Sequence, residues 1–113
     1  MKKPLIKSIK KGEGSVELLL SFPEDAEYFD GHFPNVPILP GVAQVHLAMG
    51  FAEEHFGIVP ELIEMKAIKF SRVITPNTDI KLVLSQEAQK NKITYAYSHG
   101  GKACSSGIFI LNN

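Results

Sequence analysis

The sequence predicts an α+β domain in which an antiparallel β-sheet wraps around one long, buried helix. The first observation is size: 113 residues, 44% of them hydrophobic, are enough for one domain with a real core. The second is that apolar residues recur with helical spacing over residues 41–56. The third is that segments on both sides of this stretch have the composition and alternation of strands. No internal repeat or linker-like change in composition divides the chain, so we expect residues 1–113 to form a single domain.

Two strands are predicted before the helix. Residues 4–10 form a weak first candidate, and Gly12 and Gly14 mark the turn that follows. Residues 15–22, SVELLLSF, are rich in strand-forming residues. Residues 23–40 are rich in Pro, Asp, Gly and aromatic residues, which favours irregular structure. A loop of this length inside a compact domain is usually functional or contains short helical turns.

The predicted helix, residues 41–56, is apolar around most of its circumference. Two stripes result, one of Val42, Val45, His46, Met49 and Glu53 and the other of Ala43, Leu47 and Gly50. Gln44 lies on a different face, where its side chain could make a structural hydrogen bond. A helix with so little polar surface is normally buried. Gly57 and Pro60 are expected to end it.

Four strands are predicted after the helix, at residues 62–74, 79–89, 92–99 and 102–111. In the first, Ile68, Phe70 and Arg72 fall on one side. The next two alternate clearly, and their expected buried residues are Ile80, Leu82, Leu84, Ile93, Tyr95 and Tyr97. Turn residues separate the strands, namely Pro76-Asn77, Asn91 and Gly100-Gly101.

Composition argues against several classes of protein. Lysine plus arginine number 12 and aspartate plus glutamate number 12, so the formal net charge is zero, which argues against a protein that mainly binds nucleic acid or an anionic membrane. Cys104 is the one cysteine and cannot form an intrachain disulfide, and no Cys/His spacing is typical of a zinc site. No segment resembles a signal peptide or reaches the length of a membrane span. We expect a protein of a reducing compartment, the cytoplasm, with no bound metal.

His32 is the first candidate for chemistry. It lies in the predicted irregular segment between Gly31 and Phe33, with Phe29 three residues earlier. The two phenylalanines could shelter the imidazole, and Gly31 lets the backbone approach a ligand. Nearby prolines limit the motion of the loop. A general base must be held in place and partly desolvated, and this setting could do both. The alternative is an ordinary loop histidine with a satisfied hydrogen bond.

Two more candidates lie in the helix. Gly41 follows Pro40 at the predicted helix start, where backbone N–H groups and the helix dipole can hold an anion or a developing oxyanion. The alternative is a plain Pro-Gly entry into a helix. His46 lies five residues later, about 7.5 Å along the axis at ~1.5 Å per residue. A histidine on an apolar helical face can be catalytic, but it can also be a core residue bonded to backbone or water.

Two motifs connect these residues to a known family. Residues 31–42, GHFPNVPILPGV, resemble the GHFP-x-x-P-x-x-PG signature of the 3-hydroxyacyl-acyl-carrier-protein dehydratases. Residues 69–76, KFSRVITP, resemble the K-F-x-R-x-x-x-P motif of a strand in the same family. The resemblance spans most of the chain, from about Glu17 to Ile110. The short length and the VAQ after the Pro-Gly pair look most like the compact dehydratases of bacterial aryl-polyene-type clusters.

The resemblance implies a hotdog fold and an enzyme that dehydrates a 3-hydroxyacyl thioester to the trans-2-enoyl form, in fatty-acid or aryl-polyene-type biosynthesis. His32 matches the histidine that removes the α-proton. Phe33 and the helix start, Gly41 and Val42, match positions that contact the substrate, and a helix-start N–H polarises the thioester carbonyl. The family carries Glu or Asp where this chain has His46.

His46 leaves three interpretations open. As an acid or water-orienting group, it would help the 3-hydroxyl leave in a working dehydratase. Alternatively, the protein is a hotdog thioesterase, or it binds acyl thioesters without turnover as a partner subunit. We favour the dehydratase, because His32 and the Pro-Gly helix start are intact.

The resemblance also implies partners. Hotdog subunits usually join their sheets and build each site from two chains, so we expect a homodimer or higher homo-oligomer, with a related dehydratase subunit as an alternative partner. The acyl chain would run in a tunnel beside the helix. Lys66, Lys69 and Arg72 form a modest basic cluster that would contact the acidic acyl carrier protein or its phosphopantetheine phosphate, although a solvated strand face is the simpler interpretation. No cofactor is expected beyond the phosphopantetheine that carries the substrate on acyl carrier protein or coenzyme A.

Overall fold

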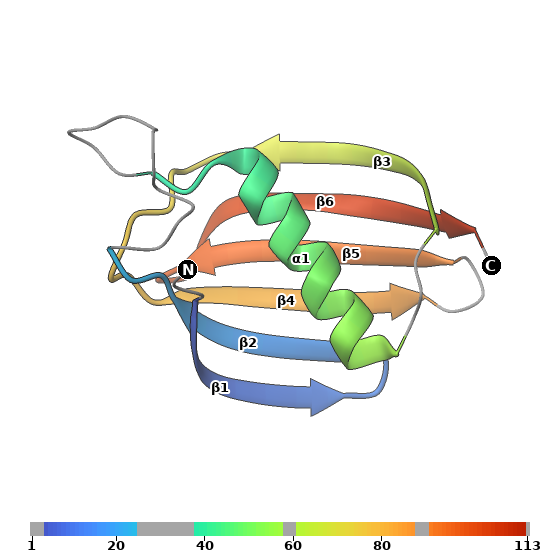
Figure 1. Ribbon diagram of the computed structural model, residues 1–113, viewed down its shortest axis with the longest axis horizontal. Helices are drawn as coiled ribbons and strands as arrows, with labels where there is room; N and C mark the ends of the chain where they lie inside the picture. Colours follow the sequence, from blue (N-terminus) through green and yellow to red (C-terminus); the bar gives the residue numbers. More distant parts are fainter. Residues whose placement is uncertain (1–3, 25–37, 58–60, 88–90, 113) are drawn as a thin grey trace.

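The computed structural model describes residues 4–24, 38–57, 61–87 and 91–112, which form one sheet and one helix (Figure 1). In chain order the elements are β1 (Leu5–Gly12), β2 (Ser15–Ser21), α1 (Gly41–Phe56), β3 (Glu61–Phe70), β4 (Ile80–Glu87), β5 (Lys92–His99) and β6 (Lys102–Asn112). The six strands are antiparallel and lie in the order β1-β2-β4-β5-β6-β3, and α1 crosses one face of the sheet. The predicted α+β arrangement is confirmed, and the helix has the predicted bounds.

The order of the strands follows from the position of the helix. After β2, the chain crosses the sheet as α1, and β3 then pairs with β6 at the opposite edge. β4, β5 and β6 form a meander that fills the space between β2 and β3. Gly100 and Gly101, with φ of 56° and 79°, make the tight β5–β6 turn that the sequence predicts. β1 and β3 are therefore the two edges of the described sheet.

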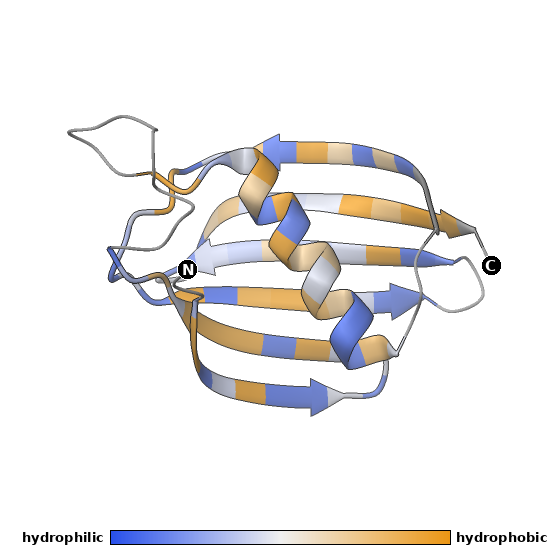
Figure 2. Cartoon of the chain, in the orientation of Figure 1, coloured by the Kyte–Doolittle hydropathy of each residue, from blue (hydrophilic) through white to orange (hydrophobic). Residues whose placement is uncertain are grey.

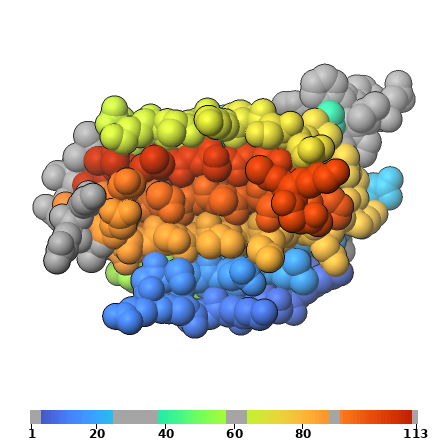
Figure 3. Space-filling model, turned by 180° about the vertical axis from the view of Figure 1, so that it is seen from behind, coloured from blue at the N-terminus to red at the C-terminus, as the bar shows by residue number. Residues whose placement is uncertain are grey.

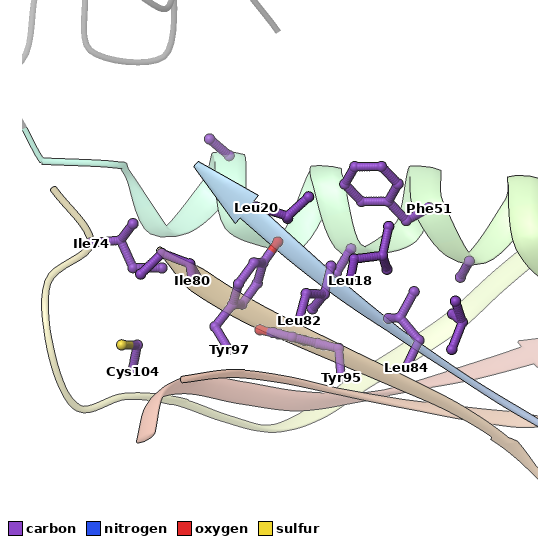
Figure 4. Packing of buried hydrophobic residues seen from close by; sticks show 14 of the residues in the cluster. Leu18, Leu20, Phe51, Ile74, Ile80, Leu82, Leu84, Tyr95, Tyr97 and Cys104 are labelled. Atoms are coloured by element: carbon purple, nitrogen blue, oxygen red, sulfur yellow. The ribbon is translucent and has the colours of Figure 1, made fainter. Parts of the chain in front are cut away.

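The core lies between α1 and the sheet, where apolar residues concentrate on β2 and β4 (Figure 2) and pack beneath the helix (Figure 4). The alternating residues predicted for β4 and β5 all point into it, each at most 2% exposed: Ile80, Leu82, Leu84, Ile93, Tyr95 and Tyr97. Leu18 and Leu20 of β2 are equally buried. Each fully buried side chain of this size contributes roughly 1.5–3 kcal/mol to folding. Figure 3 shows the opposite face of the sheet, where the strands lie side by side with no described helix over them.

The buried face of α1 differs from the face that the periodicity favours. Its buried residues are Ala43, Gln44, Ala48, Phe51 and Ala52. In contrast, Val42 is 83% exposed, and His46 is exposed as well. Alanines are small and let the helix approach the sheet closely. Hydropathy ranks valine and methionine above alanine, so hydropathy alone predicts the wrong buried face. The helix is therefore buried along one side, and its other side faces outward in the single chain. It ends at Gly57, with φ of 63°, as predicted.

A β-bulge shapes β3. Its register against β6 shifts between Lys66 and Lys69, and Ala67 has a positive φ of 55°. Opposite the bulge lies Gly107, where an added Cβ would collide with Cδ1 of Ile68 and with the ring of a neighbouring tyrosine. Glycine is therefore required at this position for packing.

β3 ends at Phe70, before the predicted end at residue 74. The N–H groups of Ser71 and Arg72 both donate to the carbonyl of Cys104, at 2.7 and 3.1 Å, so the regular ladder stops there. Arg72 consequently lies in the connection to β4 and not in the strand. No helix in the described part of the chain is long and apolar enough to cross a membrane.

We expect Gly107→Ala to lower the free energy of unfolding by about 1–3 kcal/mol, because the added methyl group overpacks the core beneath the bulge. Urea unfolding followed by circular dichroism measures this change. Gly50→Ala is the matched control, because Gly50 lies in α1 and an added Cβ there meets nothing within 4 Å. That substitution should stabilise the protein by roughly 0.5–1 kcal/mol. Equal effects of the two substitutions would contradict the packing argument.

Candidate active site

The predicted base lies outside the described residues. His32 and Phe33 belong to residues 25–37, so their placement stays a prediction. The helix start, His46 and the basic residues after the helix are all described. Gly41 and Arg72 line one hollow beside α1, and His46 lines a separate one.

The first hollow opens at the start of α1 and measures about 450 Å³. Pro40 and Gly41 lie on one side of it, and Phe70, Arg72 and Val73 lie on the other. No described side chain caps the helix: Pro40, with φ of −63° and ψ of 148°, has no side-chain acceptor, and the first turn has no acidic residue. The N–H groups of the first turn and the positive end of the helix dipole lie at this end of α1, beside the hollow.

Gly41 has a packing reason for being glycine. A Cβ added there would lie 2.7 Å from Cζ of Phe70, so the ring lies directly against the first turn. Phe70 is 54% exposed, and together with Val73 it gives the hollow an apolar wall. Apolar walls exclude water and strengthen a hydrogen bond from an N–H group to a bound oxygen. These surroundings suit the oxyanion site that we predicted at the helix start.

A buried polar cluster lies beneath the helix start. Gln44, 3% exposed, donates from Nε2 to the carbonyl of Leu39 at 3.1 Å and accepts at Oε1 from Oγ of Ser105 at 2.6 Å. The carbonyl of Gln44 also accepts from Oη of Tyr97 at 2.7 Å, and Figure 4 shows that hydroxyl pointing toward α1. The sequence allowed a structural hydrogen bond for Gln44 but did not reveal its partners. A regular hairpin around Gly100-Gly101 would pair Tyr97 with Cys104, and only the register shift in the structure places Ser105 opposite Tyr97, so the sequence carried no signal for this pair.

The second hollow, of about 430 Å³, lies along another side of α1 and contains His46. Ile6, Leu47 and Phe51 supply its apolar walls. The structure does not bring His46 and Gly41 to one hollow, because five residues turn the helix by roughly 140° beyond a full turn. Our prediction considered only the distance along the axis and missed this rotation. The interpretation of His46 as a core residue is wrong, because the side chain is exposed in the single chain.

The basic cluster follows the edge of β3. Lys66, Lys69 and Arg72 are all exposed, and none makes an ion pair with a described residue. Arg72 lines the hollow at the helix start, whereas the two lysines do not. Arg72 also lies near the buried Cys104: burial raises the pKa of the Cys104 thiol, and the Arg72 guanidinium offsets part of that rise. Among the described residues, no group of three His, Cys, Asp or Glu side chains could hold a metal ion.

An antiparallel sheet that wraps one helix, with an open helix start at one edge, is the arrangement of a hotdog-fold protein. Solved structures establish this fold. The dehydratase heterocomplex ApeI:P from Xenorhabdus doucetiae aligns with a TM-score of 0.92 at 24% identity, over 99% of this chain and 100% of that chain. The crystal structure of an uncharacterized protein from Erwinia carotovora subsp. atroseptica aligns with a TM-score of 0.83 at 32% identity, over 98% of this chain and 97% of that one.

Sequence comparison identifies the family within the hotdog-fold proteins. The family described as ApeI-like, ApeI dehydratase, matches residues 8–108. The 3-hydroxyacyl-[acyl-carrier-protein] dehydratase FabZ of Erythrobacter litoralis is 30% identical, over 91% of this chain and 72% of that protein. The chain belongs to the ApeI-like dehydratase family and is an enzyme of the hydro-lyase class. The resemblance drawn from the GHFP and Pro-Gly motifs is confirmed.

We expect the thiol of Cys104 to react slowly with a chromogenic disulfide reagent. Burial shields the sulfur and raises its pKa above the ordinary value of 9.0, so less thiolate is present at pH 8 than in a free cysteine. The folded protein should react on the order of tenfold or more slowly than the urea-unfolded chain. Its rate should still rise above pH 9, because thiolate continues to form there. Equal reaction rates for the folded and the unfolded protein would show that Cys104 is accessible to the reagent in the folded state.

Proposed function

We propose that this chain catalyses the reversible dehydration of a 3-hydroxyacyl thioester to the trans-2-enoyl thioester, with the acyl group carried on the phosphopantetheine of acyl carrier protein. The observation that carries the proposal is the start of α1, which no described side chain caps and which lies beside an apolar-walled hollow of about 450 Å³. Family membership and the FabZ relative support the same reaction. We assign the enzyme to fatty-acid or aryl-polyene-type biosynthesis in the cytoplasm, without a further cofactor.

The reaction removes a weakly acidic proton, so negative charge must be stabilised as it forms. His32 takes the proton from C2, and the electron pair moves toward the thioester carbonyl. The N–H groups of Gly41 and Val42 donate to that oxygen as it becomes an enolate, and the helix dipole adds to the stabilisation. The C3–O bond then breaks, the C2=C3 bond forms, and the hydroxyl receives a proton and leaves as water. Phe33 contacts the substrate beside His32.

In this proposal His46 gives the proton to the leaving hydroxyl. Its ring is exposed and lies roughly 140° around α1 from Gly41, so it is not directed to the helix start of its own chain. We therefore assign it to the site of a second subunit, where it faces the partner subunit's His32. The hollow beside His46, with its walls of Leu47 and Phe51, then accommodates the acyl chain.

The outward side of the chain supports a site built from two subunits. Exposed apolar residues lie on β3, just after it and at the helix start, namely Val42, Met65, Phe70 and Val73. β3 is an edge strand whose outer side has no partner within the described sheet. We assign this edge to pairing with a second copy, which gives a homodimer or a higher homo-oligomer. A related dehydratase subunit is the alternative partner, because the Xenorhabdus doucetiae structure is a dehydratase heterocomplex.

The basic cluster gives the acyl carrier protein a place to dock. Lys66, Lys69 and Arg72 are exposed and make no ion pair with a described residue, so their charges are available to an acidic partner. Arg72 lines the hollow at the helix start, where a guanidinium suits the phosphate of phosphopantetheine. The two lysines lie farther along β3 and meet the carrier protein itself.

We expect the purified protein to interconvert 3-hydroxyacyl and trans-2-enoyl thioesters, measured by the absorbance of the conjugated double bond. His32→Ala should lower kcat by roughly 10²–10⁴-fold, the range for loss of a general base. Release of free thiol in the same reactions would instead indicate a thioesterase. Tight binding of a thioester without conversion would indicate a binding subunit. No turnover at any chain length, on acyl carrier protein or coenzyme A, would refute the dehydratase.

Co-expression of two impaired variants tests the shared site. A dimer of one His32→Ala chain and one His46→Ala chain has one site with both wild-type histidines, if each site draws on two chains. When the two chains pair at random, about half of the dimers are mixed and each has one complete site of two, so the sample should regain about a quarter of the wild-type activity. If His46 serves its own chain, the mixed dimers contain no complete site and regain nothing.

His46→Asp, made alone, tests whether the histidine has a role of its own. We expect a lower kcat, because the imidazole is the acid in this proposal. A strong rise in kcat would show that His46 is a defect in a site designed for a carboxylate.

A further inference from the structure

The segment that leads into α1 is fixed by hydrogen bonds on both sides of one residue. The N–H of Leu39 donates to the carbonyl of Ile74 at 2.8 Å, and the carbonyl of Leu39 accepts from Nε2 of Gln44 at 3.1 Å. Leu39 and Ile74 are 1% and 0% exposed. The backbone N–H of Gln44 donates to the carbonyl of Pro40 at 3.1 Å. Two bonds from one glutamine therefore close a short loop that contains the first residues of α1.

The same glutamine is bonded to the sheet. Ser105 donates from Oγ to Oε1 of Gln44 at 2.6 Å, and Tyr97 donates from Oη to its backbone carbonyl at 2.7 Å. Tyr97 and Ser105 are paired across β5 and β6 and are 0% and 2% exposed, so the sheet sets their positions. The hydroxyl groups of Tyr97 and Ser105 thus determine the distance of the helix start from the sheet and its orientation.

Packing alone does not require a glutamine at this position. Its neighbours on the buried face of α1 are alanines and a phenylalanine, and a methionine of similar size would be buried without any need for partners. A buried amide fixes one geometry, because its donors and acceptors have directions. We propose that Gln44, with Tyr97 and Ser105, is a positioning residue that sets where the first N–H groups of α1 point. The proposal rests on the dehydratase function proposed above.

Removal of single hydroxyl groups tests the proposal. Tyr95 is the comparison for Tyr97: it lies on the same face of β5 and is 2% exposed, and its hydroxyl lies near Ser105 but makes no hydrogen bond to Gln44. Burial raises the pKa of Tyr95, and the nearby Ser105 offsets part of that rise. Tyr97→Phe and Ser105→Ala should each lower kcat about tenfold with little change in KM, because the N–H donors lose their alignment. Tyr95→Phe should leave kcat within roughly twofold of wild type.

Gln44→Glu gives a readout that a merely structural role would not change. A protonated carboxyl group can donate to Leu39 and accept from Ser105, as the amide does. The ionised form places a second acceptor against the carbonyl of Leu39. The ratio of variant to wild-type kcat should therefore fall as pH rises through the titration of this carboxyl group, while circular dichroism shows both proteins folded. A ratio that does not change with pH would overturn the proposal.

Amide hydrogen exchange separates this proposal from the proposed function. By NMR, the hydrogen-bonded N–H groups of Leu39 and Gln44 should exchange about tenfold faster in Tyr97→Phe and Ser105→Ala than in Tyr95→Phe. If wild type shows no dehydratase turnover, the proposed function fails, and the exchange rates still decide whether the network positions the helix start. Unchanged exchange would overturn the proposal, as would a lower melting temperature with an unchanged kcat of the folded protein.

Discussion

The contact between the first turn of α1 and the β5–β6 hairpin governs the rest of this structure. Alanines on the buried face of α1 bring the helix close to the sheet, and two hydroxyl groups then bond to Gln44. Each such bond contributes only about 0.5–1.5 kcal/mol net, whereas a buried group left unpaired costs about 1–3 kcal/mol. One placement of the helix start therefore satisfies every partner, and a displaced helix would not. The direction of the first N–H groups follows from that placement.

Helical geometry then divides the chemistry between two sides of α1. Gly41 opens onto the hollow bounded by Phe70, whereas His46 opens onto the hollow bounded by Phe51. One chain does not direct both groups at one substrate, but two chains can when each presents a different side. The apolar surface around β3 lies next to the helix start and is exposed in the single chain. In the proposed function, a second subunit accounts for both the divided site and the exposed edge at β3.

Much of the fold could be predicted because its signals are local: the Pro-Gly pair and Gly57 bound α1, and simple alternation marks β4 and β5. The rotation of α1 could not be predicted, because hydropathy undervalues the alanines that allow close packing. The bulge at Ala67 depends on Gly107, which is distant in sequence. In the candidate site, the helix start and the family motifs could be recognised because each is contained in a short segment of the sequence. The partners of Gln44 were not, because they come from strands that meet the helix only in the folded chain.

The helix start is held firmly in place, yet no described side chain bonds its first N–H groups, and these two properties usually conflict. A Ser, Thr, Asp or Asn at the N-cap typically stabilises a helix by about 1 kcal/mol, and Pro40 gives up that contribution. A capping side chain would bond the same N–H groups that a catalytic site needs for its substrate oxygen. In this chain the hydrogen bonds that hold the helix start come from Gln44, whose side chain bonds to Leu39 and Ser105 and not to the N–H groups of the first turn. The first turn is therefore held in place while no described side chain caps its N–H groups, which suits a preorganised hydrogen-bond donor.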